Sequence, residues 1–384
     1  MKIIIGPAAE GDFYFARPYL EDQFWKKLNE SHNLSIAAPR RVGKSSFMLD
    51  LLKNDKEGYF CIYIITESIN EPNEFFKKIY KTLLGTLNRG GKFKQFFEDV
   101  FKRLEIRKIS MTEIEFGKNE IDYYEEILLL CREVKENEVR IVLMIDEFSQ
   151  TLENIITDQS REIARNFLHQ CRELRQNLDV KSKINFVYTG SIGLGNLVLS
   201  IDEPRSITDL GHFNIPPLSN QEAKSLITQI IDTDPIRFEE KDREYFVKKM
   251  NWLLPYFIQV MMSEMDGICK EEVTQTITKP IIDKAFERAL DNRSYFEHWL
   301  ARLRSIFKGT DFSFAKEVLK IAAINNGIDY YQLQDATTKF NIEDTVPLVN
   351  ILQHDGYLVR DEQNRTYRFN SPLLQAWWLK NIVI

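Results

Sequence analysis

One stretch near the N-terminus limits the possible folds more than any other: an apolar run, a glycine turn, and a helix that begins with Gly-Lys-Ser. Residues 34–37 are the apolar run expected of a buried strand, and residues 47–52 have the pattern of a first helical turn. A strand, a tight loop and a helix in this order direct backbone N–H groups and the helix dipole toward one anion. The sequence therefore predicts a phosphate-binding loop, the P-loop, formed by Ala38, Pro39, Arg40, Arg41, Val42, Gly43, Lys44, Ser45 and Ser46.

Two residues of the P-loop have expected chemical roles. Lys44 brings a mobile positive charge to the terminal phosphates of a nucleotide, and the Ser45 hydroxyl is a ligand for Mg²⁺. Ala38 stands where the usual pattern begins with glycine, and alanine lacks the freedom of glycine at positive φ. Because a strand and a helix flank the loop and a second motif follows, we expect it to bind a nucleotide triphosphate with magnesium.

The second motif is an apolar strand that ends in two acids. Residues 140–145 are an apolar run that predicts a strand, and Asp146 and Glu147 follow it directly. In an open parallel sheet, ligands bind at the carboxyl ends of the strands. We expect Asp146 to hold Mg²⁺ or its water, and Glu147 to orient and polarise the water that attacks the γ-phosphate.

Three further positions have an ordinary structural explanation beside the functional one. Ser191 follows the apolar run 184–188 and is the first choice for a hydroxyl near the γ-phosphate, with Thr189 second, although Ser191 also suits a helix cap. Arg205, between the fourth and fifth predicted strands, suits an arginine finger for a neighbouring subunit or a plain surface loop. Arg17 suits a nucleotide contact or a surface position at a helix start.

Composition limits the expected partners and location. The formal net charge of −6 provides no global positive field for nucleic acid. The four cysteines have no metal-ligand spacing and predict reduced thiols in a cytoplasmic protein. No apolar run reaches membrane-spanning length, so no membrane partner is expected. A charged helix predicted at 159–178 has arginines expected on a solvated face or an interaction surface: Arg161, Arg165, Arg172 and Arg175.

The pattern of elements divides the 384 residues into three parts. Residues 1–218 predict an α/β core with a parallel sheet, in which residues 1–33 form an N-terminal segment that packs beside the P-loop. Residues 219–292 are helical throughout and predict a compact lid. Residues 293–384 predict three helices, a further helix and a two-stranded hairpin, which is the order of elements in a winged helix.

In this order, these residues resemble the prokaryotic AAA+-like ATPases known as the archaeal ATPase family, which belongs to or lies beside the STAND signalling ATPases. The resemblance covers nearly the whole chain. It is carried by Phe-Ala-Arg at 15–17, the P-loop, Ile-Asp-Glu-Phe at 145–148, Tyr-Thr-Gly-Ser at 188–191, Leu-Leu-Pro-Tyr at 253–256 and Phe-Asn-Ser-Pro-Leu-Leu-Gln-Ala-Trp-Trp at 369–378.

The resemblance implies an α/β P-loop core, a helical lid and a C-terminal winged helix. It also implies ATP and Mg²⁺ as cofactors, a catalytic role for Glu147, and a position near the adenine for Pro255. The chain departs from the family pattern at Ala38, at Ala16 and at Trp252, and the third helix of the lid has no arginine. These departures favour slow switching over a fast motor.

Three functions are compatible with the sequence. The first is a switch that closes on ATP·Mg²⁺, reopens on hydrolysis and controls self-assembly or a partner effector, with defence or mobile-element control suggested by fold analogy. The second is a DNA-binding ATPase resembling origin-recognition or transposition regulators. The third is a nucleotide-stabilised scaffold without turnover.

The charge of the expected recognition helix argues against the hypothesis that the chain binds DNA. Residues 343–354 contain no Lys or Arg and begin with two acids. Residues 291–384 hold 11 Lys+Arg against 11 Asp+Glu, so the expected winged helix is neutral. Since phosphate binding needs a basic surface, we expect this part of the chain to contact a protein rather than DNA.

Overall fold

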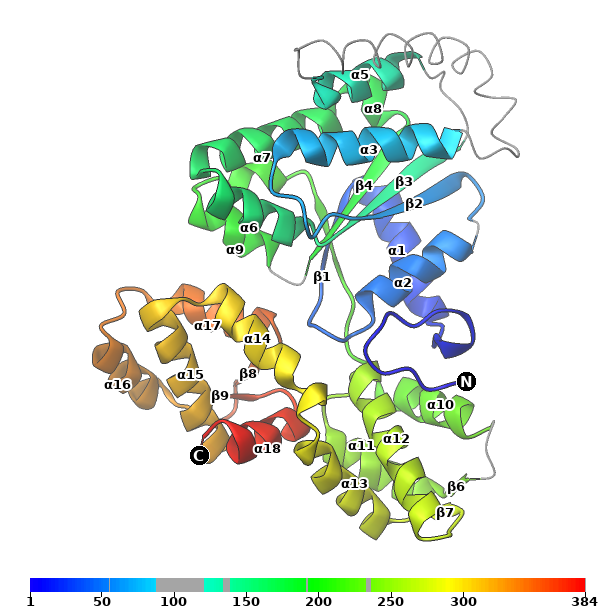
Figure 1. Ribbon diagram of the computed structural model, residues 1–384, viewed down its shortest axis with the longest axis vertical. Helices are drawn as coiled ribbons and strands as arrows, with labels where there is room; N and C mark the ends of the chain where they lie inside the picture. Colours follow the sequence, from blue (N-terminus) through cyan, green and yellow to red (C-terminus); the bar gives the residue numbers. More distant parts are fainter. Residues whose placement is uncertain (55, 88–120, 134–138, 191–192, 233–235, 384) are drawn as a thin grey trace. The chain divides into compact units, whose positions relative to one another are not determined.

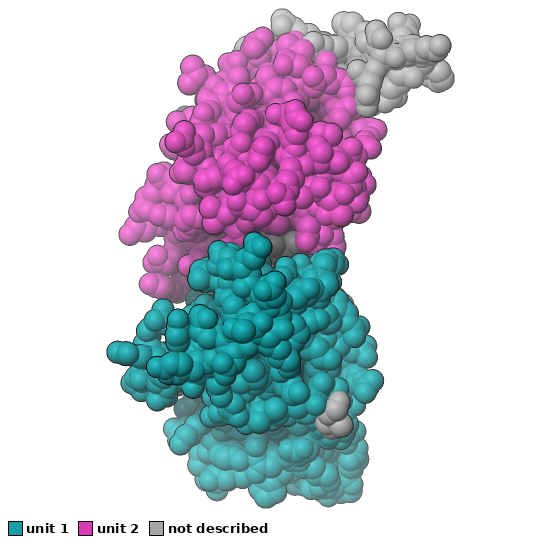
Figure 2. Space-filling view, turned by 90° about the vertical axis from the view of Figure 1, so that its left-hand side faces the viewer, with its two compact units in different colours: residues 1–17, 38–50, 215–384 teal, residues 18–37, 51–214 magenta. Residues whose placement is uncertain are grey.

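The computed structural model describes residues 1–54, 56–87, 121–133, 139–190, 193–232 and 236–383. These residues divide into two compact units (Figure 2). Unit 1, in teal, comprises residues 1–17, 38–50 and 215–384, and unit 2, in magenta, comprises residues 18–37 and 51–214. The P-loop therefore belongs to unit 1 and the acidic pair Asp146 and Glu147 to unit 2.

Unit 2 is built on a parallel sheet of five strands in the order β2-β3-β4-β1-β5 (Figure 1). The strands are β1 (Leu34–Ala37), β2 (Tyr59–Ile65), β3 (Arg140–Asp146), β4 (Ile184–Gly190) and β5 (Gly211–Asn214). Every residue of β4 and the last five residues of β3 are buried, which explains their continuous apolar sequence. The predicted α/β core with a parallel sheet is confirmed.

Helices pack against this sheet. They are α1 (Pro18–Ser31), α3 (Pro72–Leu87), α5 (Tyr123–Glu133), α6 (Phe148–Asp158), α7 (Arg161–Gln176), α8 (Leu178–Lys181) and α9 (Leu194–Ser200), with a short 3-10 turn η2 (Pro204–Ile207). One hydrophobic core joins α3, α5, α6 and α7 to strands β2, β3 and β4. Phe167 of α7 lies in this core, edge-on to Phe75 of α3 with ring centroids 5.0 Å apart.

Unit 1 is mainly helical. Its first elements are the 3-10 turn η1 (Gly11–Phe13) and the start of α2 (Lys44–Lys53). Residues from 215 add α10 (Asn220–Ile231), β6 (Arg237–Phe238), α11 (Glu240–Met250), α12 (Pro255–Glu271), β7 (Thr276–Ile277) and α13 (Lys279–Asp291). Ser219 and Glu222 form a reciprocal capping box at the start of α10, and Pro255 is the first residue of α12.

The C-terminal elements of unit 1 follow the predicted order. They are η3 (Arg293–Tyr295), α14 (Glu297–Ile306), α15 (Gly309–Ile324), α16 (Tyr330–Phe340), α17 (Thr345–His354), the antiparallel strands β8 (Leu358–Asp361) and β9 (Thr366–Phe369), and α18 (Pro372–Asn381). Trp377 and Trp378 of α18 are buried, as predicted for residues that cover this core. The division of the chain at 218/219 and 292/293 stays a prediction.

Among the described helices, none combines the length and apolar content that crossing a bilayer requires.

Candidate nucleotide site

The candidate catalytic acids lie at the carboxyl edge of the sheet in unit 2. Asp146 is the last residue of β3 and is 3% exposed. The register pairs Ala37, the last residue of β1, with Gly190, the last residue of β4, and β4 is the neighbour of β3. Three strands therefore end at one edge. Because Ala37 is bonded to Ala38, the P-loop leaves the sheet from this same edge.

Two hydroxyl groups fix the orientation of the Asp146 carboxylate. Thr189 Oγ1, from β4, donates to Oδ1 at 2.5 Å, and the Tyr63 hydroxyl, from β2, donates to Oδ2 at 2.7 Å. The backbone N–H of Glu147 also donates to Oδ1, at 3.0 Å. A carboxylate held in this way has a defined direction toward a cation or its water before any ligand arrives.

These contacts add one residue to the set that the sequence suggested. The sequence suggests Thr189, after Ser191, as the residue whose hydroxyl lies near the γ-phosphate. Thr189 contacts Asp146, whereas Ser191 lies outside the described residues. Tyr63 is not a sequence prediction. The signal that points to it is a polar ring two positions before Ile65, the residue of β2 that pairs with Asp146.

Glu147 leaves the strand in a left-handed backbone conformation, with φ 58° and ψ 33°. A non-glycine residue there costs about 1–2 kcal/mol, so the surrounding packing has to enforce the turn. Gly190 contributes to that packing, because a Cβ at this position would overlap the Ser149 side chain in the first turn of α6. Close approach of β4 thus positions the turn that carries Glu147.

The P-loop in unit 1 has the geometry expected of a tight turn before a helix. Gly43 has φ +96°, and Arg41 has φ 66°, so two of its residues take left-handed conformations. Ala38 does not have a positive φ and is 3% exposed, so alanine fits a place where glycine is usual. Lys44 is the first residue of α2, which puts the helix N-terminus where the sequence predicts it.

Three contacts hold the Arg41 side chain within unit 1. One guanidinium nitrogen donates to the Gly6 carbonyl at 2.5 Å, Nε donates to His298 Nε2 at 3.3 Å, and the guanidinium carbon lies 4.7 Å from the Tyr256 ring centroid. Burial, together with the positive charges of Arg41 and Arg40, lowers the pKa of His298 to about 3. The imidazole is therefore neutral and accepts the hydrogen bond from Arg41.

Residues of the N-terminal segment that belong to unit 1 contact the P-loop. The backbone N–H of Ala9 donates to Ser46 Oγ at 2.8 Å. Arg17 donates from Nε to Glu222 Oε1 at 2.9 Å and from a terminal nitrogen to the Pro216 carbonyl at 2.9 Å. A nucleotide contact by Arg17 would have to share or replace these partners, and it stays a prediction.

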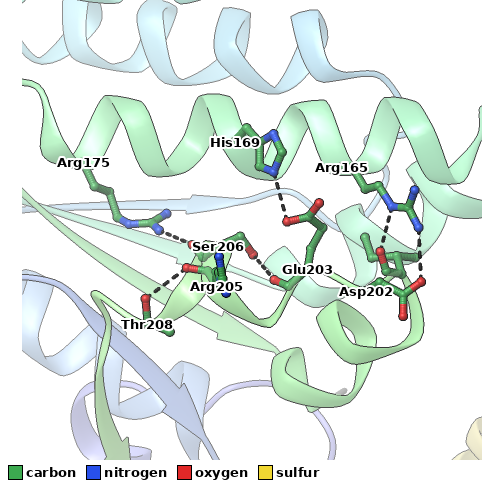
Figure 3. Close-up of polar contacts among 9 residues, drawn as sticks. Arg165, His169, Arg175, Asp202, Glu203, Arg205, Ser206 and Thr208 are labelled. Atoms are coloured by element: carbon green, nitrogen blue, oxygen red, sulfur yellow. Dashed lines mark hydrogen bonds and ion pairs between the residues drawn. The ribbon is translucent and has the colours of Figure 1, made fainter.

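Arg205 is presented by a fixed loop (Figure 3). It lies in η2, between β4 and the edge strand β5, as predicted. Its side chain is exposed, and within the described part of the chain its guanidinium has neither a hydrogen-bond nor an ion-pair partner. Side chains of α7 hold the loop on both sides of Arg205: Arg165 with Asp202 at 3.3 Å, His169 with Glu203 at 3.0 Å, and Arg175 with Asp209 at 2.7 Å.

Arg175 corrects one sequence expectation. It is 3% exposed, donates to both oxygens of Asp209 and to the Ser206 carbonyl at 2.7 Å, and lies 5.3 Å from the Tyr188 ring centroid. The expectation of a solvated face on this helix is wrong for Arg175. Its partners come from a loop beyond β4, which the spacing of charges on a helix does not reveal.

The chemistry of each candidate donor, taken singly, fits magnesium. This cation takes few protein oxygens and completes its shell with water and phosphate oxygens. The Asp146 carboxylate and the Ser45 hydroxyl are donors of that kind. The observation that supports magnesium binding is that hydrogen bonds from Thr189 and Tyr63 orient the two carboxylate oxygens of Asp146. Among the described residues, no group of three or more His, Cys, Asp or Glu side chains is placed to hold a metal ion.

Comparison with known proteins shows the fold. No protein family model and no curated protein matches the sequence. A Walker-type ATPase of Pyrococcus abyssi superposes with a TM-score of 0.62 at 15% identity, covering 97% of this chain and 98% of that chain. The ORC2 protein of Aeropyrum pernix, solved in ADPNP-ADP complexes, superposes with a TM-score of 0.55 at 12% identity, covering 96% of this chain and 93% of that chain. The chain shares its α/β architecture with these structures over nearly its whole length.

Proposed function

We propose that this chain binds ATP with Mg²⁺ and hydrolyses it slowly, as an AAA+-like switch that controls self-assembly or a protein effector. The observation that carries the proposal is the Asp146 carboxylate, held by Thr189 and Tyr63 at the sheet edge from which the P-loop departs. The fold likeness to a Walker-type ATPase and to a protein solved with ADPNP and ADP supports it. Control of defence or of a mobile element is proposed on fold analogy alone.

Each site residue has a proposed role. Lys44 neutralises the terminal phosphates, and the backbone of the P-loop surrounds them. Ser45 and Asp146 hold Mg²⁺, which supplies charge stabilisation to the phosphoryl oxygens when bound. Glu147 orients the attacking water and accepts its proton. Arg205 completes the site of a neighbouring copy.

The remaining sequence predictions belong to the same proposal. Residues 219–292 form the lid and residues 293–384 a winged helix. The contacts proposed outside the P-loop are Arg17 near the nucleotide, Ser191 near the γ-phosphate or the attacking water, and Pro255 near the adenine.

Nucleotide binding is tested by Lys44→Ala. We expect ATP affinity, measured by calorimetry, to fall about tenfold or more, because a charge-assisted phosphate contact is lost. Lys53→Ala, at the other end of α2, is the matched control and should leave the affinity unchanged. Equal affinities for the wild type and Lys44→Ala would refute the proposal.

Turnover is tested by Glu147→Gln, which keeps the size of the side chain but removes its charge. We expect ATP to bind as before and phosphate release to fall about 10²–10⁴-fold. Glu162→Gln, exposed on α7, is the control. If the wild type releases phosphate no faster than Glu147→Gln, the chain is a nucleotide-stabilised scaffold without turnover.

DNA binding is the second candidate, because helices followed by a hairpin are the elements of a winged helix. The local charges oppose it. α17 contains no Lys or Arg, and two arginines of the hairpin are in ion pairs, Arg360 with Glu362 at 3.3 Å and Arg368 with Asp361 at 3.5 Å. We therefore expect no duplex gel shift at low salt. A shift that weakens steeply with salt would favour the DNA-binding ATPase instead.

A further inference from the structure

A cleft of about 370 Å³ lies in unit 1, bordered by η3, α14, α15 and α18. We call it the basic cleft. The lining residues that matter here are Arg293, Glu297, Arg304, Phe312, Lys316 and Trp377. None of them belongs to the nucleotide site proposed above, so the following inference does not depend on ATP binding.

The basic cleft concentrates positive charge in a part of the chain that is otherwise neutral. Residues 291–384 hold 11 Lys+Arg against 11 Asp+Glu, whereas the cleft has three cations and one acid. Arg302, nearby on α14, is neutralised by Asp355 at 2.9 Å. The three cations of the cleft form no ion pair with any described residue. All three cations are exposed, so solvent screens their mutual repulsion and their charged ends are accessible to an incoming anion.

Two aromatic side chains line the same cleft. They are Phe312 and Trp377, and Trp377 is 2% exposed. The indole N–H of Trp377 has no hydrogen-bond partner among the described residues. The volume of the cleft is that of a small-molecule site.

We infer that the basic cleft binds a small organic anion in which a carboxylate or phosphate is joined to an apolar acyl or aryl group. The anionic end meets the three cations, and the apolar end packs on Phe312 and Trp377. The cleft also adjoins the end of α13, because Lys380 of α18 pairs with Asp291 at 2.7 Å and Asn381 donates to the Leu290 carbonyl at 3.3 Å.

The test is a fluorescence titration of the full chain with anilinonaphthalenesulfonate, a probe that joins an anion to apolar rings. The double variant Arg304→Gln/Lys316→Gln is expected to bind the probe about tenfold or more weakly than the wild type. The matched control is Arg365→Gln/Lys320→Gln, which removes the same charges at residues outside the cleft and should bind within about twofold of the wild type. The uncharged probe phenylnaphthylamine should not distinguish the two double variants.

The same titration identifies the kind of ligand. Decanoate is expected to displace the probe from the wild type, and an acidic peptide with a central phenylalanine is not. Lys44→Ala should give the wild-type titration, which separates the cleft from the P-loop. Equal probe affinity in the two double variants, no probe binding, or displacement by the peptide without displacement by decanoate would overturn the inference.

Discussion

At the scale of single residues, the proposed chemistry depends on a carboxylate whose two oxygens both accept hydrogen bonds. Thr189 and Tyr63 reach Asp146 from the strands on either side of β3. Thr189→Val and Tyr63→Phe each remove one hydroxyl while keeping the shape of the side chain. We expect each to lower the maximal ATPase rate about tenfold and to raise the Mg²⁺ concentration needed for half of it, because Asp146 loses its orientation.

The control for these variants is Tyr59→Phe, whose hydroxyl contacts Asn29 at the other end of β2. Because both hydroxyls act on one carboxylate, the double variant Tyr63→Phe/Thr189→Val should lose less than the sum of the two single effects in free energy. A normal Mg²⁺ dependence in both single variants would show that these hydroxyls have a packing role only.

The second residue-scale prediction concerns pH and His298. The pKa of this imidazole is about 3 in the folded chain against an ordinary value of 6.5, with burial as the main cause. Below about pH 6.5 the unfolded chain takes up a proton that the folded chain does not bind, so stability falls as pH falls. Between pH 7 and pH 5 this amounts to about 2 kcal/mol, measurable by urea unfolding. His298→Gln keeps a hydrogen-bond acceptor for Arg41 and should lose about that much of the pH dependence, and an unchanged slope would contradict the assignment.

At the scale of elements, the three ion pairs that attach the loop carrying Arg205 to α7 differ in burial. The side chains of Arg175 and Asp209 are 2% and 19% exposed, whereas those of Arg165 and Asp202 are 39% and 86% exposed. Removing one partner of a buried pair leaves the other charge uncompensated. We expect Arg175→Met to lower the free energy of unfolding by about 3 kcal/mol and Arg165→Ala by less than about 1 kcal/mol. Similar losses for both variants in urea unfolding would show that burial does not decide the strength of these contacts.

Elements that are determined by a short stretch of sequence were predictable from the sequence. β3 and β4 are buried on both faces and have continuous apolar runs, and the glycine turn before α2 has a fixed spacing, so the core sheet, the P-loop and the acids after β3 follow from pattern alone. Tyr63 and Arg175 did not follow, because each acts through a partner on a distant segment. Periodicity reports which face of an element is buried, but it does not report which buried polar groups meet.

Two residues of the P-loop also show that a motif does not determine backbone conformation or tertiary contacts. Ala38 departs from the family pattern, yet its backbone needs no positive φ, so the substitution has no conformational consequence. Arg41 takes a left-handed conformation instead, and its guanidinium is held by the Gly6 carbonyl and His298. The sequence marks Arg41 as a phosphate ligand because of its place in the loop. Its contacts with residues far along the chain come from tertiary packing, which a motif does not encode.

At the scale of the whole molecule, the proposed role of Arg205 requires a second copy of the chain, because its exposed guanidinium has no partner among the described residues. If Arg205 completes the site of a neighbour, Arg205→Ala and Glu147→Gln damage different parts of one composite site. Each variant alone should be nearly inactive, the first because no copy supplies the cation and the second because no copy activates water. In an equimolar mixture, the intact site of an Arg205→Ala chain meets the intact arginine of a Glu147→Gln chain.

Random mixing places such a pair at about one quarter of all sites in a cyclic assembly, so the mixture should recover about one quarter of the wild-type phosphate release. Mass measurement in solution with a non-hydrolysable ATP analogue checks that the two variants assemble as the wild type does, and that Lys44→Ala does not. The control mixture is Arg205→Ala with Glu147→Gln/Arg205→Ala, in which no chain offers the arginine and no activity should return. Two outcomes would show that Arg205 does not complete the site: phosphate release in the control mixture, or no phosphate release in the test mixture despite normal assembly. Any cation that acts in trans would then have to be another residue of the surface.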